Sequence, residues 1–114
     1  EVARSLDWRH VEGVEIFRKT LGIVGFGSIG QAVARRAVGF EMRVMACDPY
    51  CPPDRFEALE CAPGDVDEVV EQADILTLHA NLTEETRGII GEKQLRAMKP
   101  EALLINCGRG ALVD

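Results

Sequence analysis

The stretch LGIVGFGSIG, residues 21–30, decides the fold of this chain. Its apolar first half is typical of a buried strand, three glycines follow, and residues 31–38 continue with helical character. We expect Gly25 to permit a tight turn and Gly27 to let the backbone approach a ligand closely. We expect Gly30 to let the helix pack tightly against the strand. The pattern predicts a strand, a glycine-rich turn and a helix.

Such a helix presents free backbone N–H groups and the positive end of its dipole to a diphosphate. Asp48 follows the next apolar run, at the distance where dinucleotide-binding folds place the acid that binds the adenosine ribose. Its charge would repel a 2′-phosphate, which favours NAD over NADP. Two alternatives remain. The glycines also fit an ordinary tight turn of another α/β protein, and Asp48 also fits a turn-capping residue before Pro49.

Composition limits the class of protein. The 114 residues are 46% hydrophobic and 28% charged, which is typical of one globular domain. The net charge of −6 argues against a nucleic-acid surface, and no apolar run is long enough to span a bilayer. The chain starts at Glu1 rather than Met and stops at Asp114, so we expect a fragment of a longer protein.

The four cysteines lack the C-x-x-C spacing of zinc sites, so we predict no metal. Cys47 and Cys107 lie at the ends of apolar strands, and we interpret them as small buried thiols. Reduced thiols fit a cytoplasmic protein best.

The order of apolar runs and turn residues predicts alternating strands and helices. Strands are expected near residues 20–24, 43–47, 56–59, 74–79 and 102–106, and helices over 28–38, 65–72 and 92–98. Asp65 and Glu68 have the spacing of a capping box, and the prolines after Asp48 are expected to prevent regular structure. The predicted fold is α/β, a Rossmann-like doubly wound parallel sheet in three αβα layers, with strand order 3-2-1-4-5, truncated after the fifth strand. Residues 1–18 are interpreted as a connecting segment anchored by Trp8, and residues 19–114 as the nucleotide-binding domain.

Three stretches should converge on one edge of this sheet: the glycines, Asp48, and His79 with residues 107–110. Arg109 stands between two glycines that would allow dihedrals aiming it into the crevice, where its planar fork suits a carboxylate. The alternative is a solvated surface arginine. We interpret His79 as structural rather than catalytic. Solvated faces are predicted for the acids Asp65, Asp67, Glu68, Glu71, Glu84 and Glu85.

Four stretches in this order resemble the nucleotide-binding domain of the D-2-hydroxyacid dehydrogenases, nearest to the phosphoglycerate dehydrogenase branch. They are KTLGIVGFGSIGQAVARRA (19–37), VMACDP (44–49), ADILTLHANLTEETRGIIG (73–91) and MKPEALLINCGRGALVD (98–114). The resemblance implies an oxidoreductase that transfers a hydride between the nicotinamide of NAD and C2 of a 2-hydroxy or 2-oxo acid. It also implies a substrate domain outside this chain and a homodimer.

The resemblance assigns roles to individual residues. It implies that Ser28 and Ile29 donate their amides to the diphosphate and that Asp48 binds the adenosine ribose. It implies that Arg109 binds the substrate carboxylate and polarises its carbonyl. The residues expected to line the cofactor are Ala80, Cys107 and Gly108.

Two positions depart from the family pattern. Asn81 stands where the family usually has proline, and Gly108 where it has alanine or serine. We expect the first to change the adenine-side wall and the second to loosen the loop that carries Arg109. The family's catalytic His and its partner Glu are expected beyond residue 114, so the fragment alone should be inactive.

A rival function is an NAD-sensing corepressor on the same fold. A methyltransferase-like nucleotide binder is a third reading, in which the Arg109 loop would have no purpose.

Overall fold

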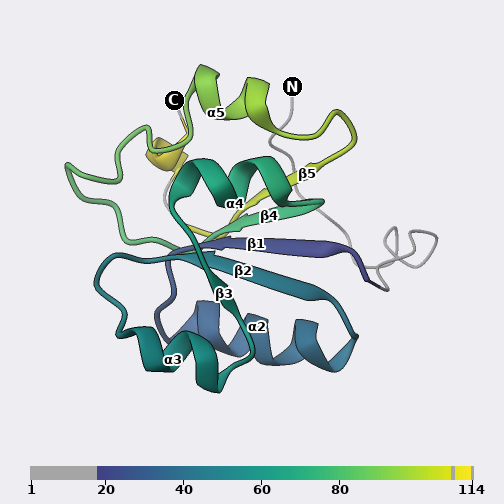
Figure 1. The fold of residues 1–114 in the computed structure, drawn as a ribbon. Coiled ribbons are helices and arrows are strands. Elements are labelled where there is room, and N and C mark those ends of the chain that lie inside the picture. The colour runs from purple at the N-terminus through teal and green to yellow at the C-terminus, as the bar shows by residue number, and fades with distance from the viewer. Residues whose placement is uncertain (1–17, 109, 114) are drawn as a thin grey trace.

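The computed structural model describes residues 18–108 and 110–113. In this part of the chain a five-stranded parallel sheet lies between two layers of helices (Figure 1). The elements are, in chain order, β1 (Thr20–Val24), α2 (Ser28–Gly39), β2 (Arg43–Cys47), α3 (Pro53–Ala58), β3 (Ala62–Pro63), α4 (Val66–Gln72), β4 (Ile75–Leu78), α5 (Glu92–Ala97), β5 (Leu103–Asn106) and a 3-10 turn (Gly110–Leu112).

The strands follow the order β3-β2-β1-β4-β5, and every neighbouring pair is parallel. Val24 of β1 stands opposite Cys47 of β2 on one side and Leu78 of β4 on the other. Leu78 in turn stands opposite Asn106 of β5. These four strands therefore end at the same level. The predicted strand order and the three-layer doubly wound architecture are confirmed.

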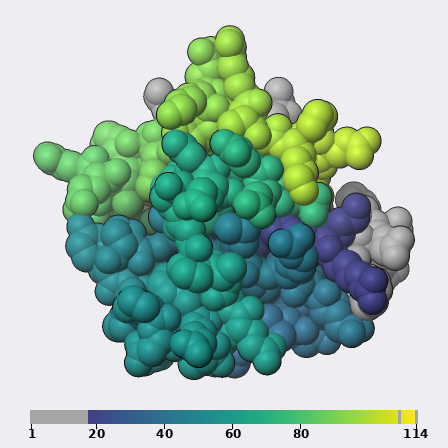
Figure 2. All heavy atoms as spheres, viewed as in Figure 1, coloured from purple at the N-terminus to yellow at the C-terminus, as the bar shows by residue number. Residues whose placement is uncertain are grey.

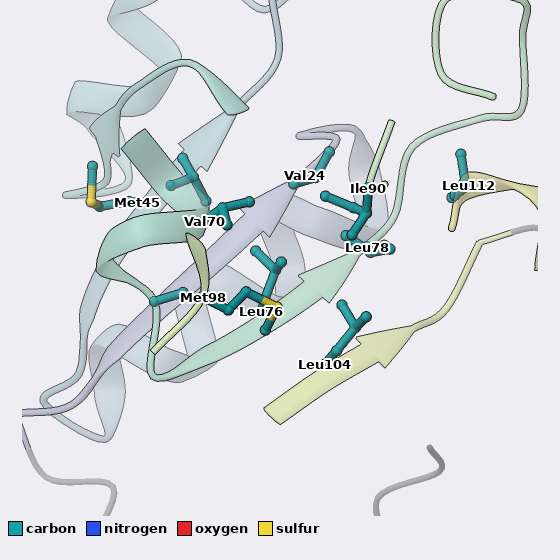
Figure 3. Close-up of a cluster of buried hydrophobic side chains, with 11 residues drawn as sticks. Val24, Met45, Val70, Leu76, Leu78, Ile90, Met98, Leu104 and Leu112 are labelled. Carbon is teal, nitrogen blue, oxygen red and sulfur yellow. The ribbon is translucent and has the colours of Figure 1, made fainter. Parts of the chain in front are cut away.

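Helices α2 and α3 cover one face of the sheet, and α4 and α5 cover the other (Figure 1). Each face buries its own apolar cluster, because strands in a parallel sheet are covered on both sides. On the α4 side, Figure 3 shows Val70 of α4 and Leu104 of β5 converging on Leu76 of β4. On the α2 side, Phe26 stacks on Phe56 of α3, with ring centroids 4.9 Å apart. The second contact ties the turn after β1 to the core.

The structure corrects the prediction for residues 49–63. The segment expected to be irregular after Asp48 contains α3, which begins at Pro53. Proline is tolerated there because the first helical N–H has no intrahelical acceptor. The strand predicted near residues 56–59 was wrong, since Phe56 belongs to α3 and its ring is buried. The third strand is the two-residue β3, which pairs with Met45 and Ala46 of β2.

The capping box predicted from Asp65 and Glu68 is present at the start of α4. The Asp65 carboxylate accepts from the Glu68 backbone N–H at 2.8 Å, and the Glu68 side chain accepts from the Asp65 N–H at 3.1 Å. Both acids therefore cap the helix, in addition to facing solvent. None of the helices in residues 18–108 and 110–113 is long and apolar enough to cross a membrane.

Asp74 fixes the opposite end of the sheet, where β1 and β4 begin. Its carboxylate accepts from the Thr20 backbone N–H at 2.8 Å and forms an ion pair with Lys99 at 3.1 Å. Burial opposes ionisation, but the Thr20 amide and the Lys99 ammonium outweigh it. They lower the pKa of the Asp74 carboxyl below its ordinary value of 3.8.

Replacing Asp74 by asparagine should lower the free energy of unfolding by about 1 kcal/mol at neutral pH, because the ion pair to Lys99 is lost. A depressed folded-state pKa adds stability above 3.8 that disappears as the pH falls through that lower pKa. The difference in free energy of unfolding between wild type and variant should therefore become smaller in acid. Denaturant titrations of the full-length protein at neutral pH and below pH 3.8 measure this. A difference that does not change with pH would contradict the role of the ion pair.

Candidate functional site

The residues that follow the four aligned strands meet at one edge of the sheet. These are Gly25 after β1, Asp48 after β2, His79 after β4 and Cys107 after β5. Their backbones continue the ladder: the Gly25 N–H donates to the Cys47 carbonyl at 2.9 Å, and the His79 N–H to Val24 at 2.7 Å. Open α/β sheets bind ligands outside this edge, where the strand order reverses. The convergence predicted from the sequence is confirmed for the described residues.

The three glycines of the turn differ in what surrounds them. Gly25 has φ +94°, and a Cβ there would lie 2.4 Å from the backbone N of Ala80. A Cβ on Gly30 would lie 2.4 Å from the Gly25 carbonyl oxygen. A Cβ on Gly27 would meet nothing within 4 Å. Two glycines are therefore required by the fold, while Gly27 keeps space open at the surface of the cleft.

Among the residues that the structure describes, none caps the first turn of α2 through its side chain. Gly27 is its N-cap residue, no side chain accepts a hydrogen bond there, and no acidic residue lies in the first turn. Ser28 and Ile29 are exposed, and both line the cleft. The amides at this helix end, with the positive end of the dipole, form a site suited to an anion.

The carboxylate of Asp48 holds two backbone groups. Its Oδ2 accepts from the Phe26 N–H at 2.9 Å, and its Oδ1 accepts from the Tyr50 N–H at 3.0 Å. Asp48 thus supports its own turn, as the capping alternative predicted, and also holds the glycine turn. An ionised carboxylate offers about four lone-pair positions, so both oxygens keep capacity to accept from a ligand.

A cleft of about 900 Å³ opens along this edge. Its volume suits a ligand of the size of a nucleotide cofactor. The structure brings most of the predicted site residues to its walls: Gly25, Gly27, Ser28, Ile29, Gly30, Asp48 and Ala80. Cys107 and Gly108 lie at the neighbouring strand end and are not among the lining residues. Arg109, like Trp8, lies outside the described residues.

His79 is half-buried beside the cleft. Its Nε2 lies 2.8 Å from the Thr77 hydroxyl, and desolvation by burial lowers the pKa of the imidazole. The neutral ring bonded to a threonine fits the structural role predicted for it. The Thr77 hydroxyl also lies 3.9 Å from the Cys107 sulfur. Thr77 therefore links the ends of β4 and β5.

The prediction of a buried Cys107 was wrong, because the structure exposes it. It stands one residue past the end of β5, where the apolar strand no longer covers it. Cys47 is half-buried, and burial, with Asp48 nearby, raises the pKa of its thiol. All four cysteines are free. Within the described part of the chain no cluster of His, Cys, Asp and Glu could hold a metal ion.

Gly108 has a role that the sequence pattern does not reveal. Its φ is not in the left-handed region, and a Cβ there would lie 2.5 Å from Leu112 Cδ1 and 2.9 Å from the Ala80 carbonyl oxygen. Its N–H donates to the Asn106 side chain at 3.0 Å. Close packing, rather than an unusual dihedral, requires this glycine. The expected loosening concerns the loop that carries Arg109, which lies outside the described residues, so it stays a prediction.

Sequence reasoning missed Tyr50 and Glu85. The Tyr50 hydroxyl lies 2.8 Å from both carboxylate oxygens of Glu85, and both residues line the cleft. Glu85 is exposed, as predicted for a solvated face, and it also accepts the hydrogen bond from Tyr50. The two residues stand 35 positions apart, so no local spacing signals the pair.

The fold and the cleft together define a dinucleotide-binding α/β domain with a glycine turn, an uncapped helix end and an acid after the second strand. The sequence of residues 1–114 matches the family model of the D-isomer specific 2-hydroxyacid dehydrogenase NAD-binding domain. The chain belongs to this family, as the NAD-binding domain of such enzymes.

Curated relatives agree with this assignment. The chain is 42% identical to D-3-phosphoglycerate dehydrogenase of Methanocaldococcus jannaschii over 109 residues, which covers 95% of this chain and 21% of the relative. It is 42% identical to glyoxylate reductase of Thermococcus litoralis over 120 residues, covering 97% of this chain and 36% of the relative. The chain therefore spans about a fifth to a third of the length of these proteins.

Solved structures have the same architecture. The NAD-complexed D-isomer specific 2-hydroxyacid dehydrogenase of Lactobacillus delbrueckii ssp. bulgaricus superposes with a TM-score of 0.81 at 45% identity, over 88% of this chain and 30% of that one. The apo D-lactate dehydrogenase of Escherichia coli gives a TM-score of 0.81 at 35% identity, over 87% and 31%. These relatives are dehydrogenases and a reductase, and they give no support to the corepressor alternative.

Proposed function

We propose that the cleft binds NAD with its diphosphate at the start of α2 and its adenosine ribose at Asp48. One observation carries this proposal: the uncapped amides of α2 stand beside the open space at Gly27. An anion there gains backbone hydrogen bonds and the helix dipole without displacing any protein group. The carboxylate of Asp48, already aligned by the Phe26 amide, has room to accept from ribose hydroxyls and repels a 2′-phosphate.

We further propose that the full-length protein is an NAD-dependent dehydrogenase for D-2-hydroxy acids. Bound nicotinamide would supply or accept the hydride at C2 of the substrate. Arg109, two residues after Cys107, would bind the substrate carboxylate through its planar fork and polarise the carbonyl. The relatives named above act on different acids, so glyoxylate and phosphoglycerate-type acids are both candidates. A homodimer in the cytoplasm completes the proposal, in keeping with the four free cysteines.

Replacing Arg109 by lysine in the full-length protein tests this function. Lysine keeps the charge and loses the fork, so kcat/KM for the preferred 2-oxo acid should fall more than tenfold, or ~1.4 kcal/mol. The affinity for NADH should change little. The assay follows NADH oxidation with a panel of 2-oxo acids, first with wild type to find the substrate. An unchanged kcat/KM, or an equal loss of NADH affinity, would show that Arg109 is not the substrate arginine.

A further inference from the structure

Two loops on either side of β1 are joined across the cleft. Tyr50 belongs to the loop after β2, and Glu85 belongs to the loop after β4. Since β1 lies between β2 and β4, the loops flank the glycine turn, and the bond between Tyr50 and Glu85 spans from one to the other. In Figure 2 the green atoms of the segment after β4 lie on the blue-green atoms of the segment after β2, at the left of the molecule.

Hydrogen bonds hold the backbone on both sides of this bridge. The Tyr50 N–H donates to Asp48 at 3.0 Å, so the acid proposed to bind the ribose also fixes the tyrosine. On the other side, the Thr86 hydroxyl accepts from the Thr83 N–H at 2.7 Å and donates to the Asn81 carbonyl at 2.6 Å. These contacts close the turn that carries Glu85. Neither loop has to reorganise its backbone to form the bridge.

The bond itself is accessible to water. Tyr50 is 76% exposed, and Glu85 is exposed as well. A hydrogen bond in contact with water breaks at low cost, because solvent replaces the lost partner. Two well-held loops joined by one solvent-accessible bond form a closure that can open without unfolding either side.

We propose that Tyr50 and Glu85 form a clasp over the adenosine end of the cleft, which opens whenever the cofactor enters or leaves. The inference rests on the proposed function, that the cleft holds NAD. Both partners belong to the protein, so the bond needs no cofactor and closes the cleft in the free and the bound protein alike. A clasp of this kind slows association and dissociation by the same factor and leaves the equilibrium affinity unchanged.

The test is a stopped-flow measurement of NADH association and dissociation rates with the full-length protein. Tyr50→Phe removes the hydroxyl and keeps the ring. Both rate constants should rise by roughly two- to tenfold, the range for one hydrogen bond of modest net strength, with Kd changing less than twofold. Glu85→Gln weakens the same hydrogen bond at its acceptor and should also raise both rate constants. The double variant should add little to Tyr50→Phe, because both remove one interaction.

Glu84→Gln is the matched control, since it removes an equal charge one residue away and makes no bond to Tyr50. Its rates should equal those of wild type. Unchanged association and dissociation rates in Tyr50→Phe would overturn the clasp. Faster dissociation with unchanged association, and therefore a higher Kd, would overturn it as well, because Tyr50 would then contact the bound cofactor directly. Wild-type protein that binds no NADH would overturn the proposed function itself, and the clasp with it.

Discussion

Replacing Gly25 by alanine is expected to lower the free energy of unfolding of the full-length protein by at least about 3 kcal/mol. The left-handed φ of +94° is unfavourable for any residue with a side chain. The added Cβ would also lie 2.4 Å from the backbone N of Ala80 and 2.6 Å from its Cα. Backbone atoms at the end of β4 cannot move aside without disturbing the pairing of β1 with β4. Denaturant titration measures the loss.

Gly27→Ala is the matched control in the same turn. Gly27 has φ −82°, which alanine adopts readily, and its Cβ would have no neighbour within 4 Å. Its free energy of unfolding should stay within about 0.5 kcal/mol of wild type. The methyl group would fill the space proposed for the diphosphate, so NADH should bind at least about tenfold more weakly, a loss of ~1.4 kcal/mol. Equal stability of the two variants, or normal NADH binding by Gly27→Ala, would contradict this division of roles.

Asp48→Ala should weaken NADH binding by about ten- to a hundredfold, because a hydrogen bond to a charged group contributes about 1.5–3 kcal/mol. The variant also leaves the Phe26 and Tyr50 amides without their carboxylate acceptor. A comparison of NADH with NADPH separates the loss of structural support from the loss of ribose recognition. Loss of structural support would weaken NADH and NADPH alike, whereas loss of ribose recognition weakens NADH and relieves the repulsion of the 2′-phosphate. Calorimetric titration with both cofactors should therefore give a smaller ratio of the NADPH Kd to the NADH Kd in the variant than in wild type.

Much of the fold follows from local patterns in the sequence. The apolar runs of β1, β2, β4 and β5 and the capping box of α4 are signals carried by consecutive or nearly consecutive residues. The segment from Pro53 to β3 was harder to predict from the sequence. Helix α3 spans six residues and β3 spans two, so neither is long enough to show a clear hydrophobic periodicity. Its helix is stabilised by the buried ring of Phe56 against Phe26, a contact between residues 30 positions apart in the sequence.

The candidate site, like the fold, has some features that the sequence predicts and others that it does not. The glycine turn and Asp48 could be predicted, since the spacing itself carries the chemistry. The exposure of Cys107 and the bond between Tyr50 and Glu85 depend on how separate loops leave the sheet, which no local pattern encodes. The packing of Gly108 against Ala80 and Leu112 is a further contact of this kind.

Binding of NADH and NADPH to the full-length wild-type protein, compared by isothermal titration calorimetry at one ionic strength, tests the assignment of this cleft most directly. With the diphosphate at the amides of Ser28 and Ile29 and the ribose at Asp48, NADH should bind more tightly than NADPH by at least about tenfold, or ~1.4 kcal/mol. Equal affinity for the two cofactors would contradict the role of Asp48. No binding of either would contradict the assignment of the cleft as a whole.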